Sequence, residues 1–371
     1  MPKVCVVTLY RHNYGAFLQA YALQRFLERA GFDAELLNYD YYNDHAILGI
    51  SVKRLRHPAS FAKTAAFRLS HRGAFRERER AIGRCVEASL LESARYRTYG
   101  AVKKHPPKAD VYMTGSDQVW NPTISEQGFL SRLLDFAPNE RNVLCSYAAS
   151  AGVPAFSDQT AALMRTCLAR FDKISVREPA TEAAIRPLTD REIVIHRDPV
   201  LLLPAEDWDG FAEGAKTERP YIFIYLAQKD PELVRYAIDL SEKTGFGIVD
   251  CHGSINYSIP NCVNGKSILS PTEFVGGIKN AAYVVTNSFH CLAFSIHYHK
   301  KAYVKLPPKG AGRLSELIGG MSLQRLLQPE PIRDGEEEEI YTHTADFLRA
   351  GQEAARAYLA ELSRILAEKR R

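Results

Sequence analysis

One stretch near the carboxyl end, residues 270–306, most narrows the folds that this chain can adopt. It predicts a helix from Pro271 to about Asn280, a buried strand with the sequence AAYVVT, a tight turn at Asn287 and a second helix that opens near His290. A short apolar strand held between two helices is typical of a parallel sheet. The stretch therefore predicts an α/β fold.

His290 stands where this strand gives way to the second helix. Ligands of parallel sheets bind at that edge, because unpaired N–H groups and the helix dipole both favour anions there. His290 is therefore a candidate catalytic residue, and the turn residues Asn287, Ser288 and Phe289 are candidates for substrate binding. Position alone leaves a second hypothesis open, in which His290 only caps the helix.

The amino end of the chain has the same build. It runs through strand KVCVVTLY, loop RHNYGAFL, helix LQAYALQRFLERAG and strand DAELLNYD, with apolar residues at helical spacing in the helix. No GxGxxG motif follows the first strand, which argues against a dinucleotide. Asn13, Tyr14 and Gly15 lie where a ligand-binding loop is expected, although the same residues suit an ordinary turn.

Two further strand ends carry polar groups. Strand ADVYMTG leads into a loop that contains Ser116, Asp117, Gln118 and Trp120. An indole beside hydrogen-bonding groups suits the face and hydroxyls of a sugar, and the alternative is that Trp120 closes the core. Strand KISVRE ends at Arg177, whose guanidinium can bind a carboxylate or phosphate with two hydrogen bonds, or can pair with a nearby acid.

A length of 371 residues makes two domains the default expectation. The predicted boundaries are a Rossmann-like domain at 1–204 with a basic helical insertion at about 41–108, a linker at 205–219, a second Rossmann-like domain at 220–342 and a final helix at 343–371. The linker is predicted because that segment shows no periodicity. The final helix carries an apolar stripe and is expected to pack back on the body.

The net charge of +5 is unevenly distributed. Residues 53–104 hold fourteen Lys or Arg against four Glu, a local balance of +10 that leaves about −5 for the remaining chain. Such a segment suits an anionic surface such as a membrane leaflet or a lipid-diphosphate glycan carrier. Nucleic acid is disfavoured because no nucleic-acid-binding motif accompanies the charge. The alternative is a solvated helical face, on which Arg72, Arg76, Arg80 and Arg84 recur every four residues.

Compartment and metal content follow from what the sequence does not contain. It has no run of eighteen apolar residues and no signal-peptide cleavage site after MPKVCVVTLY, so a cytoplasmic protein is expected. Its seven cysteines form no CxxC pair, which predicts free thiols in a reducing compartment. No HExxH motif occurs, and no metal is expected.

Six segments together carry a resemblance to one family. In chain order they are NYGAFLQAYAL, GSDQVWNP, SYAASAG, SVRE, DPVLLL and SPTEFVGGIKNAAYVVTNSFHCLAFSIHYHKKAYV. They span nearly the whole chain, and the sequence resembles the polysaccharide pyruvyl transferase family. The resemblance implies two Rossmann-like domains that face each other across a cleft, similar to the GT-B class of glycosyltransferases.

The resemblance also implies a reaction. Pyruvate would move from phosphoenolpyruvate onto two hydroxyls of a sugar, forming a cyclic ketal and releasing phosphate, with no cofactor besides the donor. The expected acceptor is a polysaccharide or a lipid-linked oligosaccharide. The basic segment 53–104 would allow peripheral contact with the inner face of an anionic membrane. Carried over by motif, the catalytic histidine is His290 of NSFHC and the catalytic arginine is Arg177 of SVRE.

One position departs from the family pattern. Some members carry an arginine two residues before the histidine, where this chain has Ser288, and its cationic role could pass to Arg313 of GAGRLSEL. Two other functions therefore stay open from the sequence. One is a GT-B glycosyltransferase that uses a nucleotide sugar, and the other is a non-catalytic module that binds a glycan or a carrier lipid.

Overall fold

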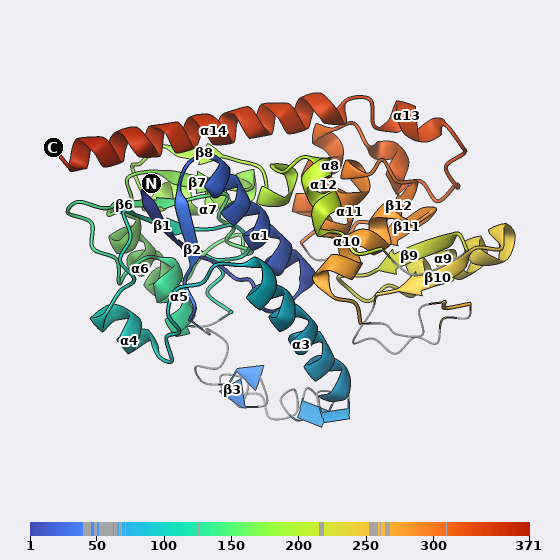
Figure 1. Cartoon of the computed structure of the whole chain (residues 1–371), viewed down its shortest axis with the longest axis horizontal. Coiled ribbons are helices and arrows are strands. Elements are labelled where there is room, and N and C mark those ends of the chain that lie inside the picture. Colours follow the sequence, from blue (N-terminus) through green and yellow to red (C-terminus); the bar gives the residue numbers. More distant parts are fainter. Residues whose placement is uncertain are drawn as a thin grey trace. The chain divides into compact units, whose positions relative to one another are not determined.

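The structure of the protein is a computed structural model. In it, the chain forms two compact units (Figure 1). The structure describes residues 1–39, 46–47, 50–51, 62, 65–66, 69–70, 72–124, 126–214, 219–251, 259, 261–263, 268–308 and 310–371. The first unit comprises residues 1–72, 86–202 and 351–371, and the second comprises 73–85 and 203–350. Within the described residues, each unit is built on a four-stranded parallel sheet, which confirms the predicted α/β class.

The sheet of the first unit has the strand order β2-β1-β5-β6. Its strands are β1 (Lys3–Val7), β2 (Asp33–Leu36), β5 (Val111–Thr114) and β6 (Val143–Ser146). A parallel pair, β7 (Ile174–Val176) and β8 (Ile193–Ile195), continues beside β6 through single bridges. The helices are α1 (Tyr14–Arg29), α4 (Tyr99–Lys104), α5 (Glu126–Arg132), α6 (Asp158–Leu168) and α7 (Pro179–Ile185), with 3₁₀ turns at Arg186–Leu188 and Pro199–Leu201. An antiparallel pair joins β3 (Ala46–Ile47) to β4 (Ile50–Ser51).

The sheet of the second unit has the order β10-β9-β11-β12. Its strands are β9 (Tyr221–Tyr225), β10 (Gly247–Asp250), β11 (Tyr283–Thr286) and β12 (Ala302–Val304). The helices are α8 (Ala205–Phe211), α9 (Pro231–Thr244), α10 (Pro271–Lys279), α11 (Phe289–His297), α12 (Gly312–Gly320) and α13 (Glu336–Ile340), with a 3₁₀ turn at Gln324–Leu327. Helices α3 (Arg72–Ser89) and α14 (Thr344–Lys369) have residues in both units. The helix, strand and second helix predicted for residues 270–306 are α10, β11 and α11.

In both sheets the order of the strands reverses at one place. Strand β1 leads through α1 to β2 on one side, whereas β5 leads to β6 on the other side. Strand β9 likewise leads through α9 to β10, and β11 leads through α11 to β12 on the opposite side. The reversal points lie between β1 and β5 and between β9 and β11. Open parallel sheets bind ligands outside the carboxyl ends of their strands at such points.

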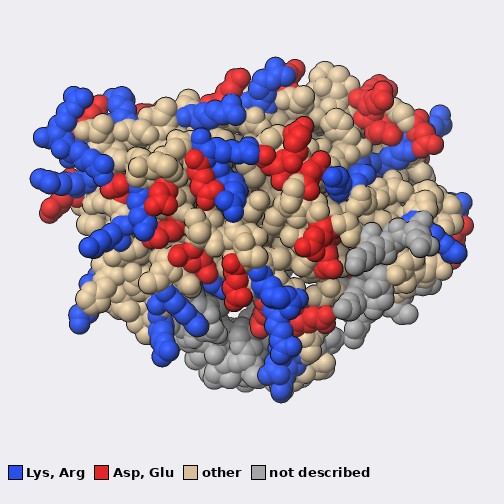
Figure 2. Space-filling view, viewed as in Figure 1, with Lys and Arg blue, Asp and Glu red and all other residues tan. Residues whose placement is uncertain are grey.

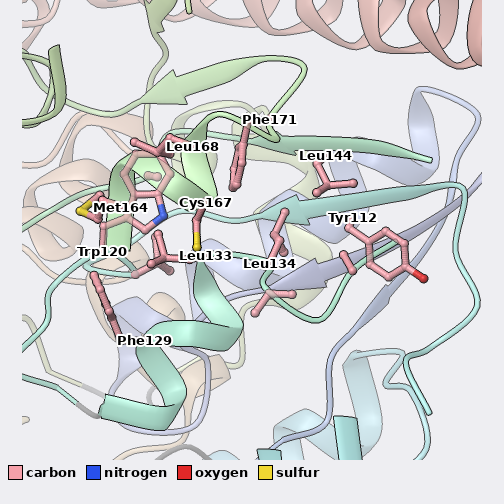
Figure 3. Close-up of a cluster of buried hydrophobic side chains, with 14 of the residues drawn as sticks. Tyr112, Trp120, Phe129, Leu133, Leu134, Leu144, Met164, Cys167, Leu168 and Phe171 are labelled. Atoms are coloured by element: carbon pink, nitrogen blue, oxygen red, sulfur yellow. The ribbon is translucent and has the colours of Figure 1, made fainter. Parts of the chain in front are cut away.

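The core of the first unit contains Trp120, which corrects one prediction. The side chain of Trp120 is 0% exposed and lies among Phe129, Leu133 and Met164 (Figure 3). Its indole N–H donates to the carbonyl of Arg132 at 3.2 Å. A side chain enclosed in this way cannot offer its face to a sugar, so the alternative that Trp120 closes the core is the one the structure supports.

The segment 205–219, predicted as a linker, is also corrected. Residues 205–211 form helix α8, and Trp208 within it is 0% exposed. Its ring packs edge-to-face against Phe294 of α11, with 4.8 Å between the ring centroids. The segment therefore belongs to the core of the second unit, which begins at residue 203 rather than after the predicted linker. Residues 215–218 lie outside the described residues.

Two predicted boundaries shift because side chains cap helical turns. Helix α1 begins at Tyr14 rather than at the predicted Leu18, since the side chain of Asn13 accepts a hydrogen bond from the N–H of Ala16 at 2.8 Å. The apolar run EIVIHRDPVLLL, residues 192–203, predicts one long strand, but the strand ends at Ile195. Beyond it, the side chain of Asp198 starts a 3₁₀ turn.

Helix α14 begins in the second unit, and residues 351–371 belong to the first. The hydroxyl of Tyr358 donates to the carbonyl of Ser146 at 2.7 Å, and the ammonium of Lys369 pairs with Asp172 at 2.7 Å. The apolar stripe of this helix is buried, as at Leu362 and Leu366. Residues 351–371 of the final helix therefore pack on the first unit, in agreement with the prediction that this helix packs back on the rest of the chain.

Helix α3 carries the described part of the basic segment. Arg72, Arg76, Arg80 and Arg84 are all exposed on it, whereas Ala81, Ile82, Cys85 and Val86 form its buried side. Figure 2 shows a column of Lys and Arg side chains over α3, with acidic side chains beside it. Residues 73–85 of the predicted insertion belong to the second unit rather than the first. The basic residues Lys53, Arg54, Arg56, Lys63 and Arg68 lie outside the described residues.

We expect Gly276→Ala to destabilise the protein. A Cβ at Gly276 of α10 would lie 1.8 Å from the carbonyl oxygen of Glu213, so backbone must shift. Such overpacking typically costs about 1–3 kcal/mol of unfolding free energy. The matched control is Gly319→Ala in α12, where no atom lies within 4 Å of the new methyl group. The control should stabilise the protein by up to about 1 kcal/mol. Urea denaturation followed by circular dichroism measures both values, and equal effects would contradict the close packing of α10.

Candidate functional site

A buried amide joins the two strand ends at the reversal point of the second unit. The side chain of Asn287, which follows β11, accepts a hydrogen bond from the N–H of Gln228 at 3.3 Å and donates to the carbonyl of Gln228 at 2.7 Å. Asn287 is 2% exposed. It therefore acts on the site by fixing the loop after β9 against the turn after β11.

The turn after β11 is capped by Ser288. The hydroxyl of Ser288 accepts a long hydrogen bond of 3.5 Å from the N–H of Cys291, and its own N–H donates to the hydroxyl of Thr286 at 3.0 Å. His290 is the second residue of α11 and is half-buried. Because Ser288 occupies the capping position, the hypothesis that His290 only caps the helix is wrong.

The imidazole of His290 lies beside the ring of Phe289. The two rings meet edge-to-face, with 5.2 Å between centroids, and Phe289 is also half-buried. Arg313 is half-buried in the first turn of α12, a helix that packs against α11. The second unit thus places a histidine at the amino end of a helix, at the carboxyl edge of a parallel sheet. That arrangement suits an anionic ligand together with proton transfer.

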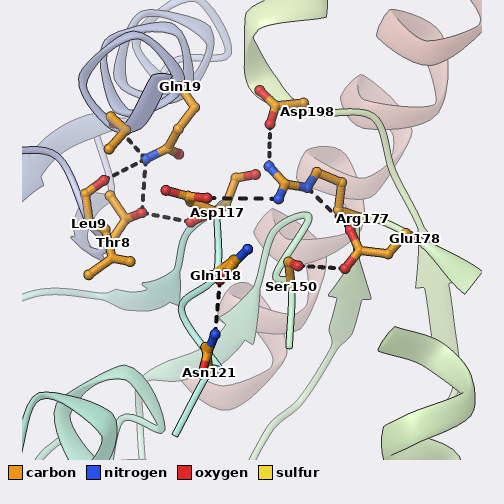
Figure 4. A network of polar contacts seen from close by, with 12 residues as sticks. Thr8, Leu9, Gln19, Asp117, Gln118, Asn121, Ser150, Arg177, Glu178 and Asp198 are labelled. Carbon is orange, nitrogen blue, oxygen red and sulfur yellow. Dashed lines mark hydrogen bonds and ion pairs between the residues drawn. The ribbon is translucent and has the colours of Figure 1, made fainter. Parts of the chain in front are cut away.

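At the reversal point of the first unit, the buried side-chain amide of Gln19 forms hydrogen bonds to the ends of the strands. The side chain of Gln19 donates to the hydroxyl of Thr8 at 3.1 Å and to the carbonyls of Leu9 and Ala16 at 2.8 and 2.9 Å (Figure 4). The hydroxyl of Thr8 donates in turn to the carbonyl of Ser116 at 2.8 Å. These bonds tie the start of α1 to the ends of β1 and β5. Tyr14 and Gly15, both buried, form the first turn of α1.

Arg177 lies in a cluster of acids at the end of β7. Its guanidinium contacts Asp198 at 2.5 Å, Glu178 at 3.3 Å and Asp117 at 3.8 Å (Figure 4). The side chain of Arg177 is 4% exposed. Burial alone would lower the pKa of this guanidinium, but the acids outweigh burial and raise it. The predicted pairing of Arg177 with a nearby acid is therefore present, and its catalytic role stays a prediction.

The two innermost acids are also held by other groups. Glu178 accepts hydrogen bonds of 2.5 Å from the hydroxyls of both Ser150 and Thr181. Asp198 accepts the N–H of Val200 at 3.1 Å, and its side chain is 0% exposed. Arg177 with Asp117, Glu178 and Asp198 carries a formal charge of −2. An anion is disfavoured beside such a cluster, whereas hydroxyl groups can donate to its carboxylates.

Two strained residues lie at the same strand ends. Asp117 after β5 has φ of 70° and Ala148 after β6 has φ of 48°. Gly152 has φ of 63°, which a glycine adopts without strain. The N–H of Ser150 donates to the carbonyl of Asp117 at 3.0 Å, so the two loops are bonded to each other. A Cβ at Gly152 would lie 2.7 Å from the side chain of Gln118. Strained positions that persist in this way often mark functional sites.

The family model for polysaccharide pyruvyl transferases matches residues 13–304, most of the chain. The chain belongs to the polysaccharide pyruvyl transferase family. No curated protein sequence matches it. Membership supports an enzyme with a role in polysaccharide pyruvylation.

Solved structures show the fold of this pyruvyl transferase family member. A protein described as a UDP-N-acetylglucosamine 2-epimerase from Listeria monocytogenes is 8% identical, with a TM-score of 0.53 over 92% of this chain and 90% of that one. The UDP-N-acetylglucosamine 2-epimerase of Neisseria meningitidis is 10% identical, with a TM-score of 0.46 over 100% and 99%. An α-glucosyltransferase in complex with UDP is 7% identical, with a TM-score of 0.49 over 99% and 100%. The fold class is the predicted GT-B-like one.

Several site residues of this transferase were not singled out from its sequence. They are Thr8, Gln19, Ser150, Asp198 and Gln228. A polar Gln19 within the apolar run of α1 was a signal, because a buried amide needs partners. Gln228 gave no such signal, since single polar residues after strands are common.

In the described part of the chain, no group of three His, Cys, Asp or Glu could hold a metal ion. Among those residues, none of the helices is both long and apolar enough to cross a membrane. The seven cysteines are free thiols, with Cys262 exposed and the others buried.

We expect Arg177→Met to destabilise the protein strongly. The substitution leaves the buried carboxylates of Asp198 and Glu178 without their cation, and breaking a buried pair typically costs about 3–5 kcal/mol. Arg186→Met is the control, because Arg186 pairs with Glu182 at the surface with 47% of its side chain exposed. The control should change stability by less than about 1 kcal/mol. Unfolding in guanidinium chloride measures both, and an Arg177→Met protein as stable as the control would show that the cluster contributes little.

Proposed function

We propose that this protein transfers pyruvate from phosphoenolpyruvate to a pair of hydroxyls on a polysaccharide or a lipid-linked glycan precursor. Family membership supports the role in polysaccharide pyruvylation. The observation that carries the choice of donor is the position of His290, at the amino end of α11 and the carboxyl edge of the second sheet. The proposal includes no cofactor and no metal besides the donor.

The reaction needs both an anion site and proton transfer. Phosphoenolpyruvate carries a phosphate and a carboxylate, and the amino end of a helix such as α11 favours negative charge through the helix dipole. Two new C–O bonds form at its central carbon and the C–O bond to phosphate breaks. Of the two hydroxyl protons released, one ends on the methylene carbon, which becomes a methyl group, and the other leaves with phosphate. His290 is the proposed group that moves these protons.

The first unit suits the acceptor better than the donor. The formal charge of −2 around Arg177 disfavours an anion, whereas a neutral sugar can donate its hydroxyl hydrogens to a carboxylate. Asp117 is the most exposed acid of this cluster, at 15% of its side chain, against 8% for Glu178 and 0% for Asp198. We therefore assign the acceptor hydroxyls to the neighbourhood of Asp117 and Gln118, and Arg177 to holding that carboxylate in place.

Phosphate release from phosphoenolpyruvate, measured with a panel of sugars and lipid-linked oligosaccharides, tests the proposal directly. A thermal-shift series with phosphoenolpyruvate, UDP and GDP accompanies it. A ligand at one hundred times its dissociation constant adds about 2.7 kcal/mol of apparent stability. Stabilisation by UDP or GDP without any response to phosphoenolpyruvate would contradict pyruvyl transfer and favour a nucleotide-sugar glycosyltransferase.

We expect His290→Ala to abolish most turnover and leave the fold intact. Loss of a general acid or base typically lowers the rate by a factor of about 100 to 10,000. His290 is half-buried and Ser288 retains the cap, so α11 should still form. The measurement is the rate of phosphate release with the best acceptor of the panel.

The matched control is His297→Ala, at the other end of the same helix. It should retain activity within a few-fold of wild type. If both variants lost activity equally, the cause would be damage to α11. If His290→Ala kept wild-type activity, another residue would have to move the protons.

We also propose that the protein is cytoplasmic and that the exposed arginines of α3 bring it to an anionic membrane that carries a lipid-linked acceptor. Four arginines at every fourth position of one helix drift slowly around its surface and stay on one side. Each basic residue near an anionic surface contributes about 1 kcal/mol of binding free energy. Such binding weakens as salt shortens the Debye length.

Replacing Arg72, Arg76, Arg80 and Arg84 with Glu should reduce activity on a lipid-linked acceptor in anionic vesicles much more than on a short soluble glycan. The charge-matched control replaces Arg349, Arg356, Arg364 and Arg371, which are exposed on α14 and at the chain end. Vesicle co-sedimentation at low and high salt measures binding separately. Equal losses on both acceptors would mean that α3 supports the fold or the site, and no loss would leave its arginines as a solvated face.

A further inference from the structure

Gln118 lies in the short loop that follows β5 at the carboxyl edge of the first sheet. The N–H of Ser150 donates to the carbonyl of Asp117, and the N–H of Trp120 donates to the carbonyl of Ser150, each at 3.0 Å. Both ends of the turn that contains Gln118 are therefore bonded to the loop after β6. Open parallel sheets bind ligands at this edge.

The side-chain amide of Gln118 is held in one position by its neighbours. The Nδ2 of Asn121 donates to the Oε1 of Gln118 at 2.9 Å (Figure 4). The amide also packs against the main chain of Gly152, because a Cβ there would lie 2.7 Å from both Cδ and Oε1 of Gln118. The amide is therefore fixed by one hydrogen bond and by a close contact that only glycine allows.

Hydrogen bonds also decide which end of the Gln118 amide faces Asn121. The Oδ1 of Asn121 accepts the N–H of Thr123 at 3.0 Å and the hydroxyl of Thr123 at 2.7 Å. A main-chain N–H can only donate, so the atom of Asn121 that it meets must be the oxygen. The nitrogen of Asn121 then faces Gln118, and because that nitrogen can only donate, it must meet the oxygen of Gln118.

The nitrogen of Gln118 is left for a partner outside this chain of bonds. In Figure 4 the Nε2 of Gln118 points away from Asn121. Gln118 is half-buried, and within the part of the chain that the structure describes no group accepts a hydrogen bond from its Nε2. The structure therefore presents a fixed N–H donor at the carboxyl edge of the sheet.

The chemistry of the ligand follows from the groups around this donor. The side chains that hold Gln118 carry no charge, so they favour a neutral polar ligand over an ion. The preceding residue, Asp117, has a carboxylate that can only accept hydrogen bonds, whereas the Nε2 of Gln118 can only donate them. A sugar carries hydroxyl groups that both donate and accept, and it can therefore satisfy the two residues together.

We propose that Gln118 is a specificity-determining residue for the acceptor sugar. Its Nε2 donates a hydrogen bond to a non-reacting oxygen of that sugar, next to the hydroxyls assigned to Asp117. Asn121 is a positioning residue, which acts by keeping the Gln118 nitrogen turned toward the sugar. This inference rests on the proposed function and adds to it the group that selects the acceptor.

Steady-state kinetics of Gln118→Met, measured by phosphate release with the best acceptor of the panel, test the assignment. Methionine keeps the length of the side chain and removes the N–H donor. The KM for the acceptor should rise about tenfold, the effect of one lost hydrogen bond. The kcat and the KM for phosphoenolpyruvate should stay within about twofold of wild type, because the bond binds the acceptor equally before and during the reaction.

Asn121→Asp tests the orientation of the amide. An aspartate at this position still accepts both groups of Thr123 but cannot donate, so Gln118 must turn its Nε2 toward it and present Oε1 to the sugar. The KM for the acceptor should again rise about tenfold. The charge-matched control is Asn139→Asp, an exposed residue that precedes β6 at the amino edge of the sheet, and its KM should stay within about twofold of wild type.

The double variant separates positioning from damage to the loop. If Asn121 acts only through Gln118, Asn121→Asp should raise the KM of Gln118→Met no further. An additional tenfold loss in the double variant would show that residue 121 acts on the loop itself and would overturn its positioning role. Gln118→Glu keeps the bond from Asn121 and replaces the donor with an acceptor, so it gives the same test if Gln118→Met folds poorly.

Monodeoxy analogues of the best acceptor test direct contact. The wild type should have an about tenfold higher KM for the analogue that lacks the contacted oxygen, and Gln118→Met should not distinguish that analogue from the parent sugar. If Gln118→Met kept the discrimination of the wild type against every analogue, direct contact would be contradicted.

The outcomes also separate this inference from the function on which it rests. If the wild type releases no phosphate from phosphoenolpyruvate with any acceptor, the proposed function fails, and the assignment of Gln118 fails with it. If the wild type is active and neither Gln118→Met nor Gln118→Glu changes the KM for the acceptor, the role of Gln118 is wrong while the proposed function stands.

Discussion

Both sheets depend on a buried amide that joins the ends of two strands whose connections run in opposite directions. Where connections diverge, carbonyl and N–H groups at the strand ends lack the partners that a continuing strand would supply, and leaving them buried without partners is costly. Gln19 satisfies this need in the first unit and Asn287 in the second. Both are almost fully buried, so their role is to fix the loops that carry the polar groups.

The two edges present different groups. Around Arg177 the carboxylates outnumber the guanidinium, and the two most buried of them already accept hydrogen bonds from hydroxyl or N–H groups. At the edge of the second sheet helix α11 begins, and the amino end of a helix favours an anion. One edge therefore suits neutral hydroxyl groups and the other suits an anion. A pyruvyl transferase needs both kinds of ligand.

The sequence predicted the segment around His290 well, and Trp120 and helix α8 less well, for physical reasons. A serine cap followed by Pro271, and a buried β-branched strand, indicate α10 and β11 from local residues alone. Trp120 was misplaced because an indole beside polar residues looks the same in a sequence whether it lines a site or closes a core. Helix α8 was missed because seven residues are too few to show a helical period.

No local sequence pattern could predict the ion pairs between residues that are far apart in the sequence. The acid nearest to Arg177, Asp198, is 21 positions away in sequence, and Lys305 reaches Asp230 across 75 positions. Only the order of the strands brings such residues together, and strand order is a property of the whole fold. The family resemblance gave the class of reaction but could not say which charges neutralise one another.

The cap at Ser288 also limits what that position can do. A side chain there either accepts the N–H of the first turn of α11 or carries a positive charge toward a ligand, because an arginine has no acceptor atom. In this chain the serine makes the cap, so position 288 stabilises the start of α11 and supplies no charge. Helix stability and ligand charge thus compete for a single position, and here helix stability occupies it.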